Sequence, residues 1–160
     1  MFFWKRKKRV EILSPLSGKK ISLEQVPDQV FSQKMMGDGF AIEPEDGFVC
    51  APVDGEVINL FPTKHAIGLK TTDGVEILIH VGIDTVELNG EGFVTHVAEG
   101  EKIKAGQKLL EFDMDFIKEK GKPLTTPVIF PQLENWVLQD QAAEKAEAGK
   151  TVAVVLEPKK

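Results

Sequence analysis

The sequence AIGLKTTDGVEILIHVGI, residues 66–83, contains two runs of β-forming residues separated by a turn signal. The first run (66–70) and the second (75–83) are rich in β-branched residues or alternate in polarity, as strands do. The TTDG segment between them favours a tight turn, because Asp-Gly is a strong hairpin signal. We therefore predict a β-hairpin, in which five apolar residues of the second run share one buried face: Val75, Ile77, Ile79, Val81 and Ile83.

Two registers fit this hairpin, and both bring two histidines together. A two-residue turn at 73–74 places His65 opposite Gly82, one diagonal step from His80, whereas a turn at 72–73 places His65 directly opposite His80. Directly opposed residues have Cβ atoms about 4.5–5.5 Å apart, and diagonal neighbours about 7–8 Å. We expect the two imidazoles to lie within working distance in either register. His80 is expected on the face opposite the apolar one, open to a large partner.

The rest of the chain repeats the alternation of short strands and turns. Turn signals rich in Gly, Asp and Pro recur along it, and further β-forming runs lie at 57–61, 108–112 and 151–157. Only 113–121, with Asp113 as a cap, and 134–149, rich in Ala, Glu and Gln, have helical character. This pattern predicts an all-β sandwich or barrel with minor helical pieces, the second of them a partly helical surface connection.

Charge divides the chain into a short basic tail and an acidic body. Of 20 basic and 25 acidic side chains, five basic ones lie in the first nine residues, which leaves a net charge of −10 for the remainder. An acidic body disfavours nucleic-acid binding, which depends on clustered Lys and Arg. Cys50 is the single cysteine, and no apolar run approaches the roughly 20 residues that span a bilayer. We expect a cytoplasmic protein.

The domain prediction follows from the same charge division. Residues 1–10 are expected to form a flexible basic tail, and 11–160 a single domain. The tail carries Phe2, Phe3 and Trp4 before its cations, an order opposite to that of an export signal. Weak, salt-sensitive membrane contact through this tail is a hypothesis, since each Lys or Arg near an anionic surface contributes about 1 kcal/mol.

The remaining motifs exclude several chemistries. Zinc needs three or four protein ligands, and the chain has neither HExxH nor CxxC. HVGID at 80–84 resembles the first zinc motif of lysostaphin-type endopeptidases, but the His-x-His element that accompanies it there is absent. GxSxG and phosphate-binding loops are absent as well, and His96 has no partner in the local pattern. A histidine nucleophile supported by a second imidazole remains, and such a group can attack phosphorus.

GVEILIHVGIDTV at 74–86 resembles the active-site signature of the glucose-type enzyme IIA of the bacterial phosphoenolpyruvate-dependent sugar phosphotransferase system. Further blocks in the family order are IxSPLSG at 12–18, VPDQVFxxKMMGDGFAIEP at 26–44, APVDGEV at 51–57, FPTKHA at 61–66 and ELNGEGF at 87–93. The resemblance covers residues 11–131. It implies a compact antiparallel β-sandwich of the hybrid-barrel type, a duplicated hybrid motif.

The resemblance also implies roles for residues. His80 would be phosphorylated, His65 would hydrogen-bond the phosphoryl group, and Thr63 would orient His65. Asp28 and Asp84 would flank the active histidine and meet basic groups on partners. The partner-binding rim would be Phe31, Met35, Met36, Phe61, Leu78 and Val86, with Glu87 at its edge.

The function implied is that of a phosphotransferase component with a phosphohistidine intermediate. It would accept a phosphoryl group from the histidine-containing phosphocarrier protein (HPr) and pass it to a sugar-specific enzyme IIB, the partner of enzyme IIC. No cofactor is expected, and His65 and His80 would bind zinc only together with a ligand from a partner. The alternative is a regulatory module of the same fold that acts on permeases or kinases through protein contacts.

Overall fold

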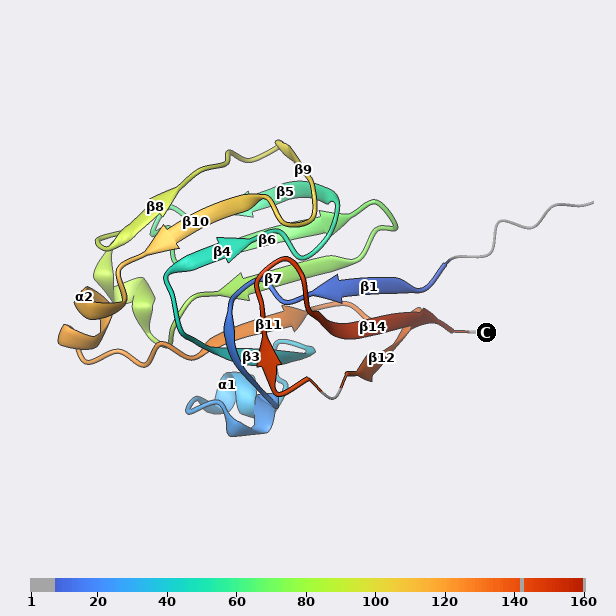
Figure 1. Ribbon diagram of the computed structural model, residues 1–160, viewed down its shortest axis with the longest axis horizontal. Coiled ribbons are helices and arrows are strands. Elements are labelled where there is room, and N and C mark those ends of the chain that lie inside the picture. Colours follow the sequence, from blue (N-terminus) through green and yellow to red (C-terminus); the bar gives the residue numbers. More distant parts are fainter. Residues whose placement is uncertain (1–7, 142, 160) are drawn as a thin grey trace, which may run out of the picture.

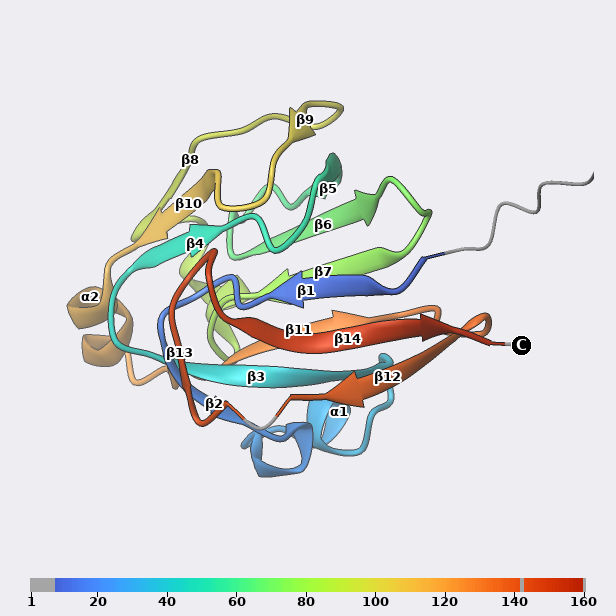
Figure 2. The same ribbon diagram turned by 45° about the vertical axis from the view of Figure 1, so that its right-hand side comes forward.

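The computed structural model describes residues 8–141 and 143–159, which form three antiparallel sheets and four short helical segments (Figures 1 and 2). The strands are β1 (Val10–Leu13), β2 (Gly18–Ile21), β3 (Asp38–Pro44), β4 (Phe48–Cys50), β5 (Gly55–Leu60), β6 (Ala66–Thr71), β7 (Glu76–His80), β8 (Phe93–Thr95), β9 (Lys102–Ile103), β10 (Lys108–Phe112), β11 (Thr126–Phe130), β12 (Trp136–Asp140), β13 (Lys145–Ala146) and β14 (Val152–Pro158). The helical segments are the 3-10 turns η1 (Leu23–Gln25) and η2 (Thr85–Leu88) and the helices α1 (Gln29–Ser32) and α2 (Met114–Glu119).

The largest sheet has eight strands, in the order β13-β2-β3-β11-β7-β6-β5-β9. Two three-stranded sheets, β4-β10-β8 and β1-β14-β12, accompany it. The main core gathers buried side chains from all three sheets, among them Ile12, Ile79, Leu110, Val128 and Val154. The all-β sandwich prediction is confirmed, because each sheet buries one face against the others.

A second, smaller core lies under η1 and α1, on the outer side of the large sheet. It consists of Leu23, Val26, Phe31, Ala41, Ile83 and Ile129. The α1 helix begins at Asp28, whose carboxylate accepts the N–H of Val30 at 2.8 Å. This cap and the small core fix the segment that carries Asp28 and Phe31 to the sheet beside His80.

The described residues of the 134–149 segment, 134–141 and 143–149, contain no helix, so the prediction of a partly helical connection is wrong. Its first part is β12, which pairs with β14 from Trp136 to Asp140, and its last part contains β13. Trp136 is only 6% exposed, and its burial against the core together with strand pairing outweighs the helical composition of the segment. The other prediction is confirmed: α2 begins at Asp113, which accepts the N–H of Phe116 at 3.1 Å.

The β6–β7 hairpin adopts neither predicted register. Ala66 pairs with His80, and Ile67 pairs with Ile79. The loop has three residues, 72–74, and it ends at Gly74 in a left-handed conformation with φ +88°. Three-residue hairpins place a left-handed residue at this position. Either predicted register would have paired buried residues of one strand with the outward face of the other, so burial selects the observed one.

The predicted tail lies mostly outside the described residues. Of residues 1–10, the structure describes only 8–10, where Arg9 makes an ion pair with Glu157 and Val10 begins β1. Within 8–141 and 143–159, no helix combines the length and the apolar character needed to cross a membrane.

Candidate active site

His80 is the last residue of β7, and its ring lies between two other rings. The His65 imidazole is 4.8 Å away between ring centroids, nearly perpendicular, and the Phe31 ring is 5.1 Å away. His80 Nδ1 lies 2.8 Å from the carbonyl oxygen of Gly82. A carbonyl can only accept, so Nδ1 carries the proton in neutral His80 and Nε2 keeps its lone pair. His80 therefore offers Nε2 as a nucleophile.

His65 is 3% exposed and precedes β6 directly. Its carbonyl accepts the N–H of Val81 at 2.7 Å, so its backbone pairs one residue beyond His80. The tight turn at 61–65, with Lys64 in a left-handed conformation, lets the ring contact His80 although the strand register alone would place it on the other face. The predicted proximity of the two imidazoles is present, but it depends on this turn.

Thr63 holds His65 from within the same turn. Its Oγ1 lies 2.7 Å from His65 Nδ1, and Phe61 contacts the His65 ring edge-on at 5.7 Å. If the hydroxyl donates to Nδ1, the proton of neutral His65 sits on Nε2. His65 then presents an N–H donor to an incoming group beside His80.

Burial lowers the pKa of both histidines. For His65 the pKa falls from 6.5 to about 4, mainly through burial and then through repulsion by His80. For His80 burial also lowers the pKa, while the Gly82 carbonyl and the carboxylates of Asp28 and Asp84 oppose the shift. Both imidazoles are therefore neutral near pH 7, as nucleophilic attack by His80 requires.

Two of the three acidic residues that the resemblance points to, Asp28 and Asp84, lie close enough to His80 to act on it. Asp28 is half-buried at the start of α1, and Asp84 is exposed in a left-handed conformation before η2. Glu87 is exposed and makes an ion pair with Lys122. Asp28 and Asp84 act on His80 electrostatically, which places negative charge beside the candidate nucleophile.

The predicted rim divides into exposed and buried members. Met35, Met36 and Val86 are exposed, at 68%, 41% and 48%, while Phe61 and Leu78 are half-buried. Phe31 differs from the other rim residues: it is 5% exposed, belongs to the small core and packs on the His80 ring, and its contact with partners stays a prediction. Exposed apolar side chains grouped near a polar centre are typical of a docking surface.

Sequence reasoning missed the two contacts that orient His80. The Phe31 ring contacts the imidazole from a distant segment, and the Gly82 carbonyl contacts it from two residues further along the chain. A glycine two residues after a histidine at a strand end was the available signal for the second contact, because a tight turn there can return a carbonyl to the ring. The first depends on tertiary packing, which no local pattern reveals.

No group of three or more His, Cys, Asp or Glu side chains in the described part of the chain could hold a metal ion. His96 has a different partner from the histidine pair: its Nε2 lies 3.3 Å from a carboxylate oxygen of Glu111 on β10. Zinc held by His65, His80 and a partner's ligand stays a prediction.

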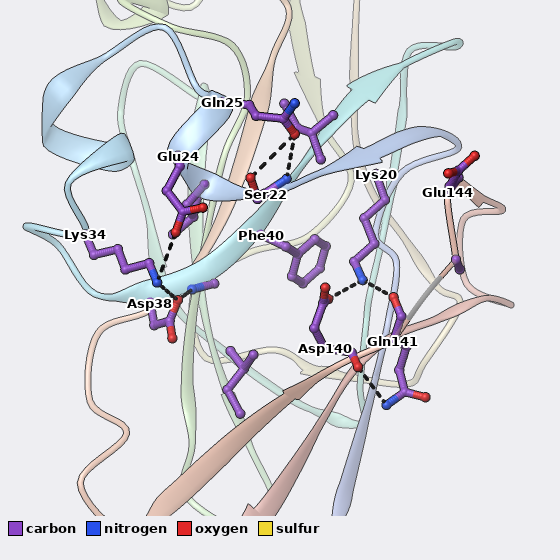
Figure 3. Close-up of a pocket in the computed structure, with 15 residues that line it drawn as sticks. Lys20, Ser22, Glu24, Gln25, Lys34, Asp38, Phe40, Asp140, Gln141 and Glu144 are labelled. Carbon is purple, nitrogen blue, oxygen red and sulfur yellow. Dashed lines mark hydrogen bonds and ion pairs between the residues drawn. The ribbon is translucent and has the colours of Figure 1, made fainter.

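A separate cleft of about 430 Å³ lies between η1, β3 and the end of β12 (Figure 3). Lys20 reaches across it to Asp140 and to the backbone carbonyl of Gln141. On the other side Lys34 makes ion pairs with Glu24 and Asp38, both at 3.5 Å. These charges pair with one another across the cleft. The ion pairs connect η1 and β12 to the large sheet.

Comparison with known proteins identifies the family. The model of the phosphoenolpyruvate-dependent sugar phosphotransferase system EIIA 1 family matches residues 10–136. The chain belongs to this family. It is a phosphocarrier of the sugar phosphotransferase system.

Relatives from several bacteria share most of the chain. A PTS system glucose-specific EIIA component of Halalkalibacterium halodurans is 49% identical over 146 residues, which is 91% of this chain and 84% of the relative. The glucosamine-specific EIICBA component of Bacillus subtilis is 60% identical over 116 residues, 72% of this chain but only 18% of that longer protein. The glucose permease IIA from Mycoplasma capricolum superposes with a TM-score of 0.87 at 37% identity, covering 96% of this chain and 99% of its own. The family resemblance is thereby confirmed.

Proposed function

We propose that His80 is the residue that carries the phosphoryl group. The observation that carries this proposal is the arrangement of its imidazole: Nδ1 is tied to the Gly82 carbonyl at 2.8 Å, and the ring lies against that of His65, where burial keeps both rings neutral. A neutral imidazole with a fixed tautomer is the form that attacks phosphorus.

The transfer step exchanges one N–P bond for another. His80 Nε2 attacks the phosphorus of a phosphohistidine on the donor, the donor's N–P bond breaks, and the electron pair returns to the donor imidazole. His80 Nδ1 keeps its proton throughout, held by the Gly82 carbonyl. Onward transfer reverses these roles, with phosphorylated His80 as the donor.

His65 and Thr63 stabilise the phosphoryl group in this scheme. The Thr63 hydroxyl donates to His65 Nδ1, and His65 Nε2–H donates to a phosphoryl oxygen on His80. A donor fixed in place before the reaction stabilises charge that develops on those oxygens. Thr63 and His65 act only as hydrogen-bonding partners, and the N–P bond forms and breaks at His80.

The partners follow from the family and its relatives. We infer that HPr supplies the phosphoryl group and that a sugar-specific enzyme IIB, acting with enzyme IIC, receives it. The relatives are named for glucose and glucosamine, which points to one of these as the sugar. Asp28, Asp84 and Glu87 would meet basic groups on these partners, and Met35, Met36 and Val86 would supply the apolar contact. We propose that phosphoryl transfer takes place in the cytoplasm, where phosphoenolpyruvate is made. No comparison favours the regulatory alternative.

The test is phosphorylation with phosphoenolpyruvate, enzyme I and HPr. Wild type should take up one acid-labile, base-stable phosphate, His80→Ala should take up none, and His96→Ala should match wild type. His65→Ala should accept phosphate but fail to pass it to enzyme IIB. Label retained in His80→Ala would contradict the site, and normal onward transfer in His65→Ala would contradict the supporting role.

A further inference from the structure

Two threonines outside the histidine pair hold the turn that follows β7. Thr85 Oγ1 donates to the carbonyl of Val81, and Thr126 Oγ1 accepts the N–H of Gly82 at 3.4 Å. Both threonines are fully buried. The Val81 carbonyl and the Gly82 N–H belong to the same peptide unit, so the two hydroxyls clamp that unit from both ends.

The next peptide unit is the one that touches His80. Its carbonyl, that of Gly82, accepts from His80 Nδ1, and its N–H, that of Ile83, donates to the Pro123 carbonyl at 3.1 Å. Between the two units Gly82 has φ +74°, and a Cβ there would lie 2.6 Å from Thr85 Cγ2 and 2.9 Å from the Pro123 oxygen. The carbonyl that fixes the His80 tautomer is therefore aimed by a packed, glycine-specific turn.

The position of Thr126 follows from the way β11 leaves β7. Val128 pairs with Ile79, and the ladder ends there. The same register places Pro127 opposite His80, and proline has no N–H to donate to a ladder. Just beyond, the Thr126 side chain supplies the acceptor for Gly82 that a continued ladder would have supplied from the backbone.

We propose that Thr85 and Thr126 are positioning residues for His80: they aim the Gly82 carbonyl at Nδ1 and so keep Nε2 as the free nucleophilic nitrogen. This inference rests on the proposed role of His80. Without the clamp the Gly82 carbonyl turns away, and the His80 proton moves to Nε2. The lone pair then lies on Nδ1, facing the turn, and the imidazole cannot attack a docked donor.

The test uses Thr126→Val and Thr85→Val, which keep the side-chain shape and remove the hydroxyl. Imidazole ¹⁵N NMR reports the tautomer of His80, which should be Nδ1–H in wild type and shift toward Nε2–H in each variant. Phosphoryl uptake from HPr should slow about tenfold, since one neutral hydrogen bond is lost. Thr126→Ser should restore both the spectrum and the rate.

Thr71→Val is the matched control. Thr71 is also a buried threonine whose hydroxyl accepts a backbone N–H, that of Val75 at 3.0 Å, but at the other end of the same hairpin. It should leave the His80 spectrum and the uptake rate unchanged. An unaltered His80 tautomer in both site variants, or an equal change in Thr71→Val, overturns the proposal. If the threonine variants shift the His80 tautomer but wild-type protein is never labelled on His80, the clamp is supported and the proposed function is contradicted.

Discussion

The two ends of the β6–β7 hairpin use the same local devices for different purposes. At the closed end Thr71 accepts the N–H of Val75, and Gly74 turns the chain with φ +88°. At the open end Thr126 accepts the N–H of Gly82, which turns the chain with φ +74°. A threonine hydroxyl and a left-handed glycine appear at both ends, yet only the open end carries the histidines.

The difference lies in what surrounds each glycine. A Cβ on Gly74 would meet open space, whereas a Cβ on Gly82 would collide with Thr85 and with the backbone of Pro123. At the closed end the glycine serves only the backbone conformation of a loop. At the open end the same conformation is packed from a distant segment, which converts a turn into a fixed support for His80.

The largest effect is expected when this packing is broken with one methyl group. Gly82→Ala adds the cost of a left-handed alanine, about 1 kcal/mol, to an overpacking cost of about 1–3 kcal/mol, so it should destabilise the fold by about 3 kcal/mol. Gly74→Ala should cost only about 1 kcal/mol. Urea unfolding of both variants measures the difference, and equal losses would show that the open end is not specially packed. Phosphoryl uptake should fail in Gly82→Ala alone.

The second prediction concerns the pH dependence of stability at the open end. The pKa of His65 falls from 6.5 to about 4 on folding, so the unfolded chain binds a proton that the folded chain excludes. The stability that His65 contributes is complete above pH 6.5 and is lost as the pH falls toward 4, by about 3 kcal/mol in all. Wild type should therefore lose about that much more stability than His65→Gln between about pH 7 and pH 4 in urea unfolding. Parallel losses would mean that His65 titrates normally.

The third prediction compares the Thr63 hydroxyl, which contacts His65, with a threonine hydroxyl in the hairpin loop. Thr63→Val removes the hydrogen bond to His65 Nδ1 and frees the ring to adopt either tautomer. Onward transfer to enzyme IIB should slow about tenfold, because the donor to the phosphoryl group is no longer fixed. Thr72→Val, an exposed threonine in the closed-end loop, is the control and should transfer at the wild-type rate. Single-turnover assays with prephosphorylated protein measure the step, and equal rates would remove Thr63 from the mechanism.

The sequence was informative where one face of a strand is buried. The alternation in residues 75–83 predicted the buried side of β7 correctly, and β10 matches the predicted run at 108–112. The register failed because it was inferred from the turn alone, without the buried face of β6. The contact of the Phe31 ring with His80 and that of Thr126 with Gly82 could not be predicted from local patterns, because each joins segments far apart in the chain. The helix expected at 134–149 failed for the same reason, since pairing with β14 decides it.

The smallest effect is expected from shortening the closed end. Deleting Thr72 leaves Asp73-Gly74 as a two-residue loop between Thr71 and Val75, a connection that suits Asp-Gly well. If the buried faces set the register, Ala66 should still pair with His80, and stability should change by less than about 1 kcal/mol. Phosphoryl uptake should then equal that of wild type, and the His80 imidazole spectrum should be unchanged. A loss of uptake with an altered His80 spectrum would show that the loop length, and not the burial of Ile67 against Ile79, holds the histidines in place.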